Sequence, residues 1–135
     1  MEDKLLSDRR ILVVEDDMLI RLSLEGMLVD LGCNSVSTAA TIDQSLRLID
    51  AHVFDTATLD VNLDGTCNYP VAETLARRGV PFVFSTGYDA HFLRDEYRNR
   101  PILKKPFLYE ELAEMLTRLL SLECTCDTYR DRCRL

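Results

Sequence analysis

Short apolar runs alternate along the chain with segments whose apolar residues recur at helical spacing. The clearest run, residues 11–14, has four aliphatic residues in a row and predicts a buried strand. The next segment carries apolar residues at i, i+4, i+7, i+8 and i+11, namely Ile20, Leu24, Met27, Leu28 and Leu31. This spacing predicts a helix with one buried face. Asp17 before this segment and Gly32 after it are typical of the two ends of a helix.

The same alternation continues to about residue 122. Further strands are predicted at about residues 35–37, 55–60, 80–85 and 102–103, and residues 62–65 predict a turn. A second helix is predicted to begin at Thr41, which opens a capping box, and a third to run from near Pro70 to Gly79. The last helix is expected to bury apolar residues at the spacing of the first: Leu108, Leu112, Met115, Leu116 and Leu119.

These five strand–helix units predict an α/β fold with a doubly wound five-stranded parallel sheet, helices on both faces and the flavodoxin-like strand order 2-1-3-4-5. The 135 residues have room for one core, which we place at residues 9–122. Residues 1–8 are expected to be an N-terminal extension. Residues 123–135 are expected to be a mobile C-terminal tail.

Charge and composition exclude several classes of protein. The net charge is −7 and no basic stripe is present, so we expect no direct binding to nucleic acid. No apolar run approaches the roughly 20 residues needed to cross a bilayer, so we expect a soluble cytoplasmic protein without membrane insertion. The five cysteines do not suggest a secreted disulfide framework. Cys124, Cys126 and Cys133 match no well-attested zinc spacing and are expected to be reduced thiols.

Chemically active side chains follow four of the five predicted strands, at the sheet edge where ligands bind in folds of this class. In chain order they are Glu15-Asp16-Asp17, Asp60, Ser85-Thr86 and Lys104-Lys105. Three carboxylates that lie close together repel one another unless a cation neutralises them. A hard divalent ion with oxygen ligands is the natural partner, and we expect Mg²⁺.

Four separated segments resemble, in the right order, the signature segments of response regulator receiver domains of two-component signalling: residues 11–17, 59–63, 84–87 and 105–107. The resemblance covers residues 9 to about 120. It implies that Asp60 is the phosphoacceptor, that Thr86 is the hydroxyl that senses the phosphoryl group, and that Lys105 pairs with that group. The function implied is phosphoryl transfer to a signalling domain that assists its own phosphorylation and slow autodephosphorylation without being an enzyme for another substrate.

The resemblance also implies how Mg²⁺ is held: directly by Asp16 and Asp60, through water by Glu15, and by the backbone carbonyl of Asn62. Asp17 is expected to cap a helix and Lys104 to be a solvated neighbour of the functional lysine.

Two positions depart from the common receiver pattern. Most receivers have an aromatic switch residue three positions before the lysine, where this chain has Ile102. Residues 84–88 instead resemble the Phe-Ala-Thr-Gly subgroup known as FAT GUY, with Ser85 in place of alanine. We expect Tyr88 to be the replacement switch residue and Gly87 to give its loop freedom to move. The alternative is that Tyr88 merely covers the site.

The implied partners are a sensor histidine kinase or histidine phosphotransfer protein as donor, and a downstream protein. Because no effector domain follows residue 122, we expect output through protein contact on the face formed by the fourth helix, fifth strand and last helix. Candidate residues are 90–93 and Tyr109, unless they belong to the core.

Two other functions stay open at this point. One is a phosphorylation-independent interaction module with a receiver fold, against which the complete set of Asp16, Asp60, Thr86 and Lys105 argues. The other is a phosphatase or phosphotransferase with an aspartyl-phosphate intermediate. Such enzymes normally carry a second Asp two residues after the nucleophile, where this chain has Asn62.

Overall fold

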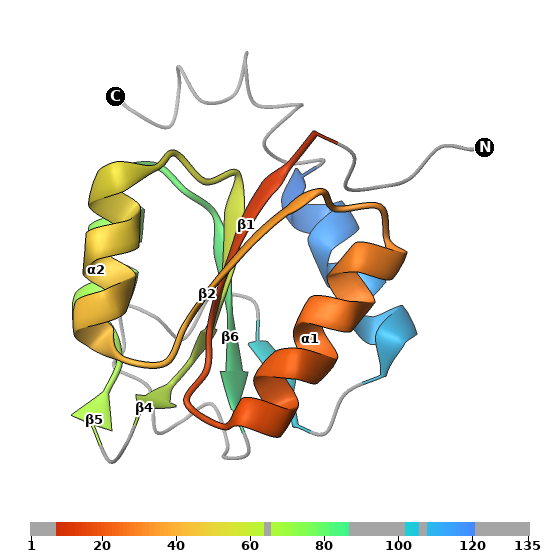
Figure 1. Cartoon of the computed structure of the whole chain (residues 1–135), viewed down its shortest axis with the longest axis horizontal. Coiled ribbons are helices and arrows are strands. Elements are labelled where there is room, and N and C mark those ends of the chain that lie inside the picture. The colour runs from red at the N-terminus through yellow and green to blue at the C-terminus, as the bar shows by residue number, and fades with distance from the viewer. Residues whose placement is uncertain (1–7, 64–65, 87–101, 106–107, 121–135) are drawn as a thin grey trace.

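A five-stranded parallel sheet forms the centre of the computed structural model (Figure 1), which describes residues 8–63, 66–86, 102–105 and 108–120. The strands of this sheet are β1 (Arg10–Val14), β2 (Ser35–Ala39), β3 (Thr56–Asp60), β6 (Phe82–Thr86) and β7 (Ile102–Lys104). Their order in the sheet is β2-β1-β3-β6-β7, and every neighbouring pair is parallel. The predicted order 2-1-3-4-5 is therefore confirmed.

Helices cover both faces of the sheet (Figure 1). They are α1 (Met18–Asp30), α2 (Ile42–Ala51), α3 (Tyr69–Arg77) and a last helix over residues 109–120. Buried residues of α1 and the last helix belong to one hydrophobic cluster, and those of α2 and α3 belong to another. The described part of the chain is thus a three-layer sandwich, with the sheet between two pairs of helices.

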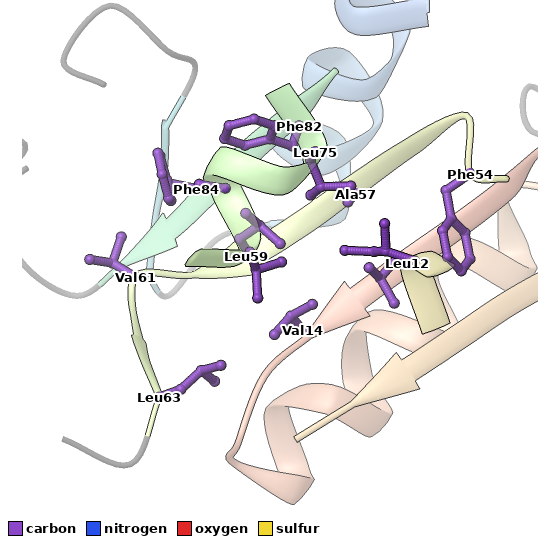
Figure 2. Close-up of a cluster of buried hydrophobic side chains, with 13 residues drawn as sticks. Leu12, Val14, Phe54, Ala57, Leu59, Val61, Leu63, Leu75, Phe82 and Phe84 are labelled. Carbon is purple, nitrogen blue, oxygen red and sulfur yellow. The ribbon is translucent and has the colours of Figure 1, made fainter. Parts of the chain in front are cut away.

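The central strand β1 contributes side chains to both cores. Leu12 and Val14 belong to the cluster beneath α2 and α3, which Figure 2 shows, while Ile11 and Val13 belong to the cluster beneath α1 and the last helix. Successive residues of a strand point to opposite faces, so a strand covered on both sides must be apolar throughout. This explains why the sequence shows an unbroken aliphatic run here.

Local signals set the ends of the helices as predicted. The Asp17 carboxylate accepts hydrogen bonds from the backbone N–H groups of Leu19 at 2.9 Å and Ile20 at 3.2 Å, so Asp17 is the N-cap of α1. Thr41 Oγ1 accepts from the N–H of Gln44 at 3.0 Å at the start of α2. Gly32, directly after the C-cap of α1, has a φ of 97°, a conformation that costs glycine little.

Two features differ from the sequence-based expectations. A short antiparallel hairpin, β4 (Asn62–Leu63) with β5 (Thr66–Cys67), follows β3 where only a turn was expected. Leu108 is 65% exposed and precedes the last helix, whereas Leu120 is buried in the core. Apolar spacing identified the helix correctly, and Leu112, Leu116 and Leu119 are buried as predicted, but the predicted face wrongly included Leu108. The predicted fourth helix lies outside the described residues.

No helix within the described ranges combines the length and the apolar character that a membrane crossing requires.

Candidate functional site

The register of the parallel sheet brings two carboxylates together at the carboxyl ends of β1 and β3. Val14 is paired with Leu59, so the residues that follow them, Glu15 and Asp60, come side by side. Both are buried, with 1% and 7% of their surface exposed. Carboxylates are rarely buried unless they are paired or bind a cation, so this placement indicates a site.

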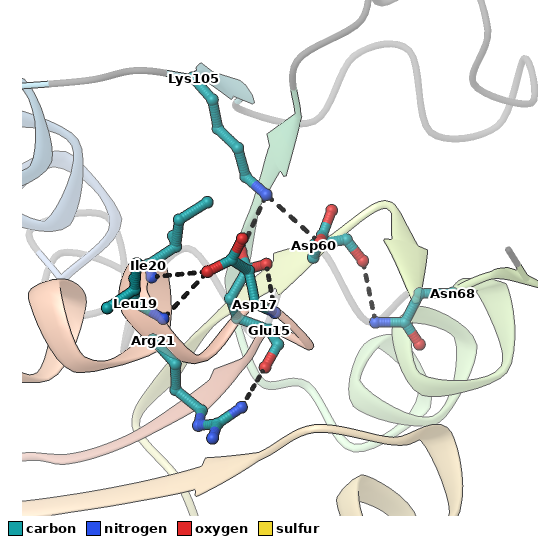
Figure 3. Close-up of polar contacts among 8 residues, drawn as sticks. All are labelled: Glu15, Asp17, Leu19, Ile20, Arg21, Asp60, Asn68 and Lys105. Carbon is teal, nitrogen blue, oxygen red and sulfur yellow. Dashed lines mark hydrogen bonds and ion pairs between the residues drawn. The ribbon is translucent and has the colours of Figure 1, made fainter. Parts of the chain in front are cut away.

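Lys105 reaches across this edge from the end of β7 to both carboxylates (Figure 3). Its Nζ lies 2.9 Å from Glu15 Oε1 and 3.3 Å from Asp60 Oδ2. The backbone N–H of Lys105 donates to the carbonyl of Thr86 at 2.7 Å, which fixes where the lysine leaves the sheet. The predicted convergence of residues 15, 60 and 105 is therefore present in the structure.

Opposing influences act on the Lys105 ammonium. Burial, the largest, would lower the pKa of Lys105. The hydrogen bond to Glu15 and the negative charge of Asp60 act the other way and outweigh burial, so the pKa of Lys105 is raised above its ordinary value of 10.5. The lysine is therefore a permanent positive charge at neutral pH.

Glu15 is held in place by hydrogen bonds with the residue that caps α1, with α1 itself and with β2. Its Oε2 accepts from the N–H of Asp17 at 3.2 Å, and its backbone carbonyl accepts from Arg21 Nη1 at 3.0 Å (Figure 3). Its own N–H donates to Ala39 on β2 at 3.0 Å. The carboxylate thus has a defined position before any ligand binds.

The acidic residues at this edge fit a divalent cation. Glu15, Asp16 and Asp60 each offer one carboxylate oxygen, and these three atoms lie within 4.8 Å of one another. Oxygen donors in a cluster with net negative charge suit Mg²⁺. Asp16 is exposed while the other two carboxylates are buried, so the cluster is open to solvent on one side. Lys105 offsets only part of the negative charge.

The remaining predicted site residues are placed as follows. Thr86 is the last residue of β6 and is 3% exposed. Ile102 is paired with Phe84 and is partly buried against the core beneath α2 and α3. Asn62 is the first residue of β4, two positions after Asp60, and is paired with Cys67. Gly87 and Tyr88 lie outside the described residues, as do residues 90–93 and the cysteines of the tail.

Asn68 belongs to the same site and was not predicted from the sequence. Its Nδ2 donates to the backbone carbonyl of Asp60 at 3.2 Å (Figure 3). Its backbone N–H donates to the carbonyl of Val61 at 2.7 Å. An asparagine before a Tyr-Pro pair at the start of a helix suggests a helix cap. The structure shows a different use, since Asn68 is at the N-cap position of α3 but makes no side-chain cap hydrogen bond.

Several known proteins are similar to this chain. A solved structure of SdrG from Sphingomonas melonis Fr1 is 41% identical, with a TM-score of 0.75 over 85% of this chain and 97% of that one. The response regulator PhyR from Brucella abortus is 25% identical, with a TM-score of 0.79 over 90% of this chain and 51% of that one. The transcriptional regulatory protein PdtaR from Mycobacterium tuberculosis is 30% identical over 108 residues, 77% of this chain.

The chain spans about half the length of PdtaR, 53%, so the match concerns one part of that protein. The family model described as the response regulator receiver domain matches residues 11–117, which include both carboxylates and the lysine of the site. The chain therefore belongs to the response regulator receiver domain family, the signalling domains of two-component systems.

Proposed function

We propose that this receiver domain, over residues 9–122, accepts a phosphoryl group on Asp60 and signals through contact with another protein. The observation that carries the proposal is the placement of the Asp60 carboxylate. It is buried at the carboxyl edge of the sheet, 3.3 Å from the ammonium of Lys105, with an oxygen within 4.8 Å of an oxygen of each of two further carboxylates. A nucleophile with positive charge held next to it is what phosphoryl transfer requires.

The transfer step follows from these groups. An oxygen of the ionised Asp60 carboxylate attacks phosphorus, the O–P bond forms, and the P–N bond of a phosphohistidine donor breaks. The electron pair of that bond stays on the imidazole, which takes up a proton as it leaves. Lys105 stays charged throughout and neutralises the phosphoryl oxygens as they approach the acidic edge.

The residues present would hold Mg²⁺ through Asp16, Asp60 and the carbonyl of Asn62, with Glu15 acting through water. When bound, the ion supplies further positive charge for the phosphoryl oxygens. Glu15 has a separate role in the proposal, because its contact at 2.9 Å positions Lys105 across the edge of the sheet.

Signalling is proposed to begin when the phosphoryl group engages Thr86 and Lys105 and shifts the nearby loop between two arrangements. The implied donor is a histidine kinase or histidine phosphotransfer protein. The implied output surface is the face around β7 and the last helix, where Tyr109 is partly exposed. Tyr88, Gly87 and Ile102 remain predictions for the residues that transmit the shift.

Incubation with acetyl phosphate and Mg²⁺, followed by intact-mass measurement, tests the proposal. We expect the wild type to gain one phosphoryl group and Asp60→Asn to gain none. Asp55→Asn is the matched control, because Asp55 directly precedes the same strand at its opposite end, and this variant should be phosphorylated like the wild type. A wild type that gains nothing would instead support a phosphorylation-independent module. Repeated turnover of a small phosphate ester would support an enzyme.

A further inference from the structure

The segment between β3 and α3 is a loop closed at its base by one residue. The chain leaves the sheet at Asp60, turns through β4 and β5, and returns at Asn68. There, the Asn68 side chain donates to the carbonyl of Asp60 and its backbone N–H donates to the carbonyl of Val61. Two consecutive peptide groups at the exit of the strand are thus held by the same asparagine.

The chain around Asn62 is anchored on either side. Val61 and Leu63 are 8% and 2% exposed and belong to the core beneath α2 and α3 (Figure 2). Asn62 lies between them and is paired with Cys67 across the hairpin. A residue whose neighbours are packed in the core and whose pairing partner directly precedes Asn68 has little freedom to move its backbone. The proposed metal-binding carbonyl is therefore positioned in advance.

The side chain of Asn68 is used in an unusual way. It is fully buried, and its Oδ1 has no hydrogen-bond partner even though α3 begins at the next residue. A buried amide oxygen without a partner costs about 1–3 kcal/mol, and an asparagine that served only as a helix cap would direct this oxygen to α3. The NH₂ group of the amide, and not its oxygen, makes the hydrogen bond, which it donates to the backbone carbonyl of Asp60.

We propose that Asn68 is a positioning residue for the metal site, which sets the affinity for Mg²⁺ by holding the carbonyls at the exit of β3. The inference rests on the proposed function, because that function assigns the Asn62 carbonyl to the metal. Asn68 itself does not touch the ion. Groups that orient the ligands of a metal typically change its affinity about 10-fold to 100-fold when they are removed.

Two variants separate positioning from folding. Asn68→Ala removes both the contact with Asp60 and any chance of capping α3. Asn68→Ser is also too short to reach the Asp60 carbonyl but retains a hydroxyl that can cap α3, so it should be the more stable of the two. Ser45→Ala is the matched control, since Ser45 is fully buried in α2 and its hydroxyl donates to the carbonyl of Thr41 at 2.7 Å.

The measurements are the Mg²⁺ dissociation constant of the full chain by calorimetry and the free energy of unfolding in urea without Mg²⁺. We expect both Asn68 variants to bind Mg²⁺ about 10-fold more weakly than the wild type, although they differ in stability. Ser45→Ala should lose stability and keep the wild-type affinity. Unchanged affinity in the Asn68 variants, or affinity that falls with stability in all three variants, would overturn the inference.

The same data keep this inference apart from the proposed function. If the wild type binds Mg²⁺ but acetyl phosphate leaves no phosphoryl group on it, the phosphoacceptor proposal fails while the calorimetric comparison still decides the role of Asn68. A wild type that binds no Mg²⁺ overturns the metal site and, with it, the role of Asn68.

Discussion

The two ends of the sheet each carry an ion pair between residues at the ends of different strands, but the pairs differ in charge balance and in exposure. At the amino end, Asp55 accepts from the N–H of Arg10 at 2.8 Å and lies 3.7 Å from the Arg9 guanidinium. The Arg9 and Asp55 side chains are 29% and 32% exposed. At the carboxyl end, Lys105 pairs with Glu15 and Asp60, whose side chains are 1% and 9% exposed.

This difference shows which kind of charge cluster indicates a function. The amino-end pair joins the Asp55 carboxylate to the Arg9 guanidinium, both in partial contact with water, so the two charges of this pair balance. At the carboxyl end, one lysine pairs with Glu15 and Asp60, and Asp16 adds a third carboxylate, which leaves a surplus of negative charge beside two buried carboxylates. An ion pair alone would not have distinguished the two ends. The surplus of negative charge distinguishes them, because a cation can bind to it.

The largest difference between the two ends should appear when the lysine is removed. Lys105→Met leaves the carboxylates of Glu15 and Asp60 buried without their ammonium partner, and we expect it to lower the free energy of unfolding by about 3 kcal/mol without Mg²⁺. Because Mg²⁺ would neutralise the same carboxylates, saturating Mg²⁺ should recover part of this loss. Urea unfolding with EDTA and with Mg²⁺ measures both effects.

Arg9→Met is the control for that experiment at the amino end. Its pair is partly exposed, so we expect a loss of less than about 1 kcal/mol that does not respond to Mg²⁺. Equal losses at both ends, or a loss in Lys105→Met that Mg²⁺ leaves unchanged, would contradict the distinction drawn between them.

A smaller effect on the free energy of unfolding should appear at alkaline pH, where the ammonium at the carboxyl end loses its charge. The pKa of Lys105 is raised in the folded protein, so its pairs contribute their full stability below the ordinary value of 10.5 and lose it as pH rises through the folded value. Between pH 10.5 and the raised pKa of the folded protein, the free energy of unfolding of the wild type should fall by at most about 1.4 kcal/mol per pH unit more than that of Lys105→Met. Unfolding in urea from pH 9 to 11.5 measures the difference between the two proteins, which cancels the titration of other groups. Parallel pH profiles would show that the pairs of Lys105 do not stabilise the fold.

Much of the fold and the centre of the site could be predicted from the sequence, for physical reasons that particular residues show. The run at 11–14 is apolar because both faces of β1 are covered, and this marks a central strand of a parallel sheet. Parallel strands end at the same edge, so acids and a lysine at strand ends had to converge. The contacts of Lys105 with Glu15 and Asp60 are the result of that geometry.

The hairpin and Asn68 could not be predicted in the same way. Strands of two residues are too short to show any alternation, and an Asp-Gly pair such as Asp64-Gly65 is typical both of an isolated turn and of the connection between hairpin strands. The role of Asn68 depends on a contact with a residue eight positions away, while its sequence context suggests a helix cap. Leu108 shows a third limit, since apolar spacing identifies a buried face but not the turn at which the helix starts.

The smallest effect concerns two cysteines, one near each end of the sheet. Cys33 is buried beside the amino end, where its thiol donates to the carbonyls of Arg9 and Ser35, each at 3.4 Å. Burial raises the pKa of this thiol, the hydrogen bond with the Ser35 backbone lowers it, and the charge of Asp55 raises it, with a net increase. Cys67, on the hairpin after Asp60, is exposed.

Alkylation by iodoacetamide at pH 8, followed residue by residue by peptide mass spectrometry, should therefore modify Cys67 quickly and Cys33 only slowly until urea is added. Both thiols are compared in the same unsubstituted protein, so the difference in rate reports the burial of Cys33, through its access to the reagent and through its raised pKa. If Cys33 reacted as fast as Cys67, the amino end would open as readily as the hairpin beside the site. The contrast would then lie in charge balance and not in how tightly each end is closed.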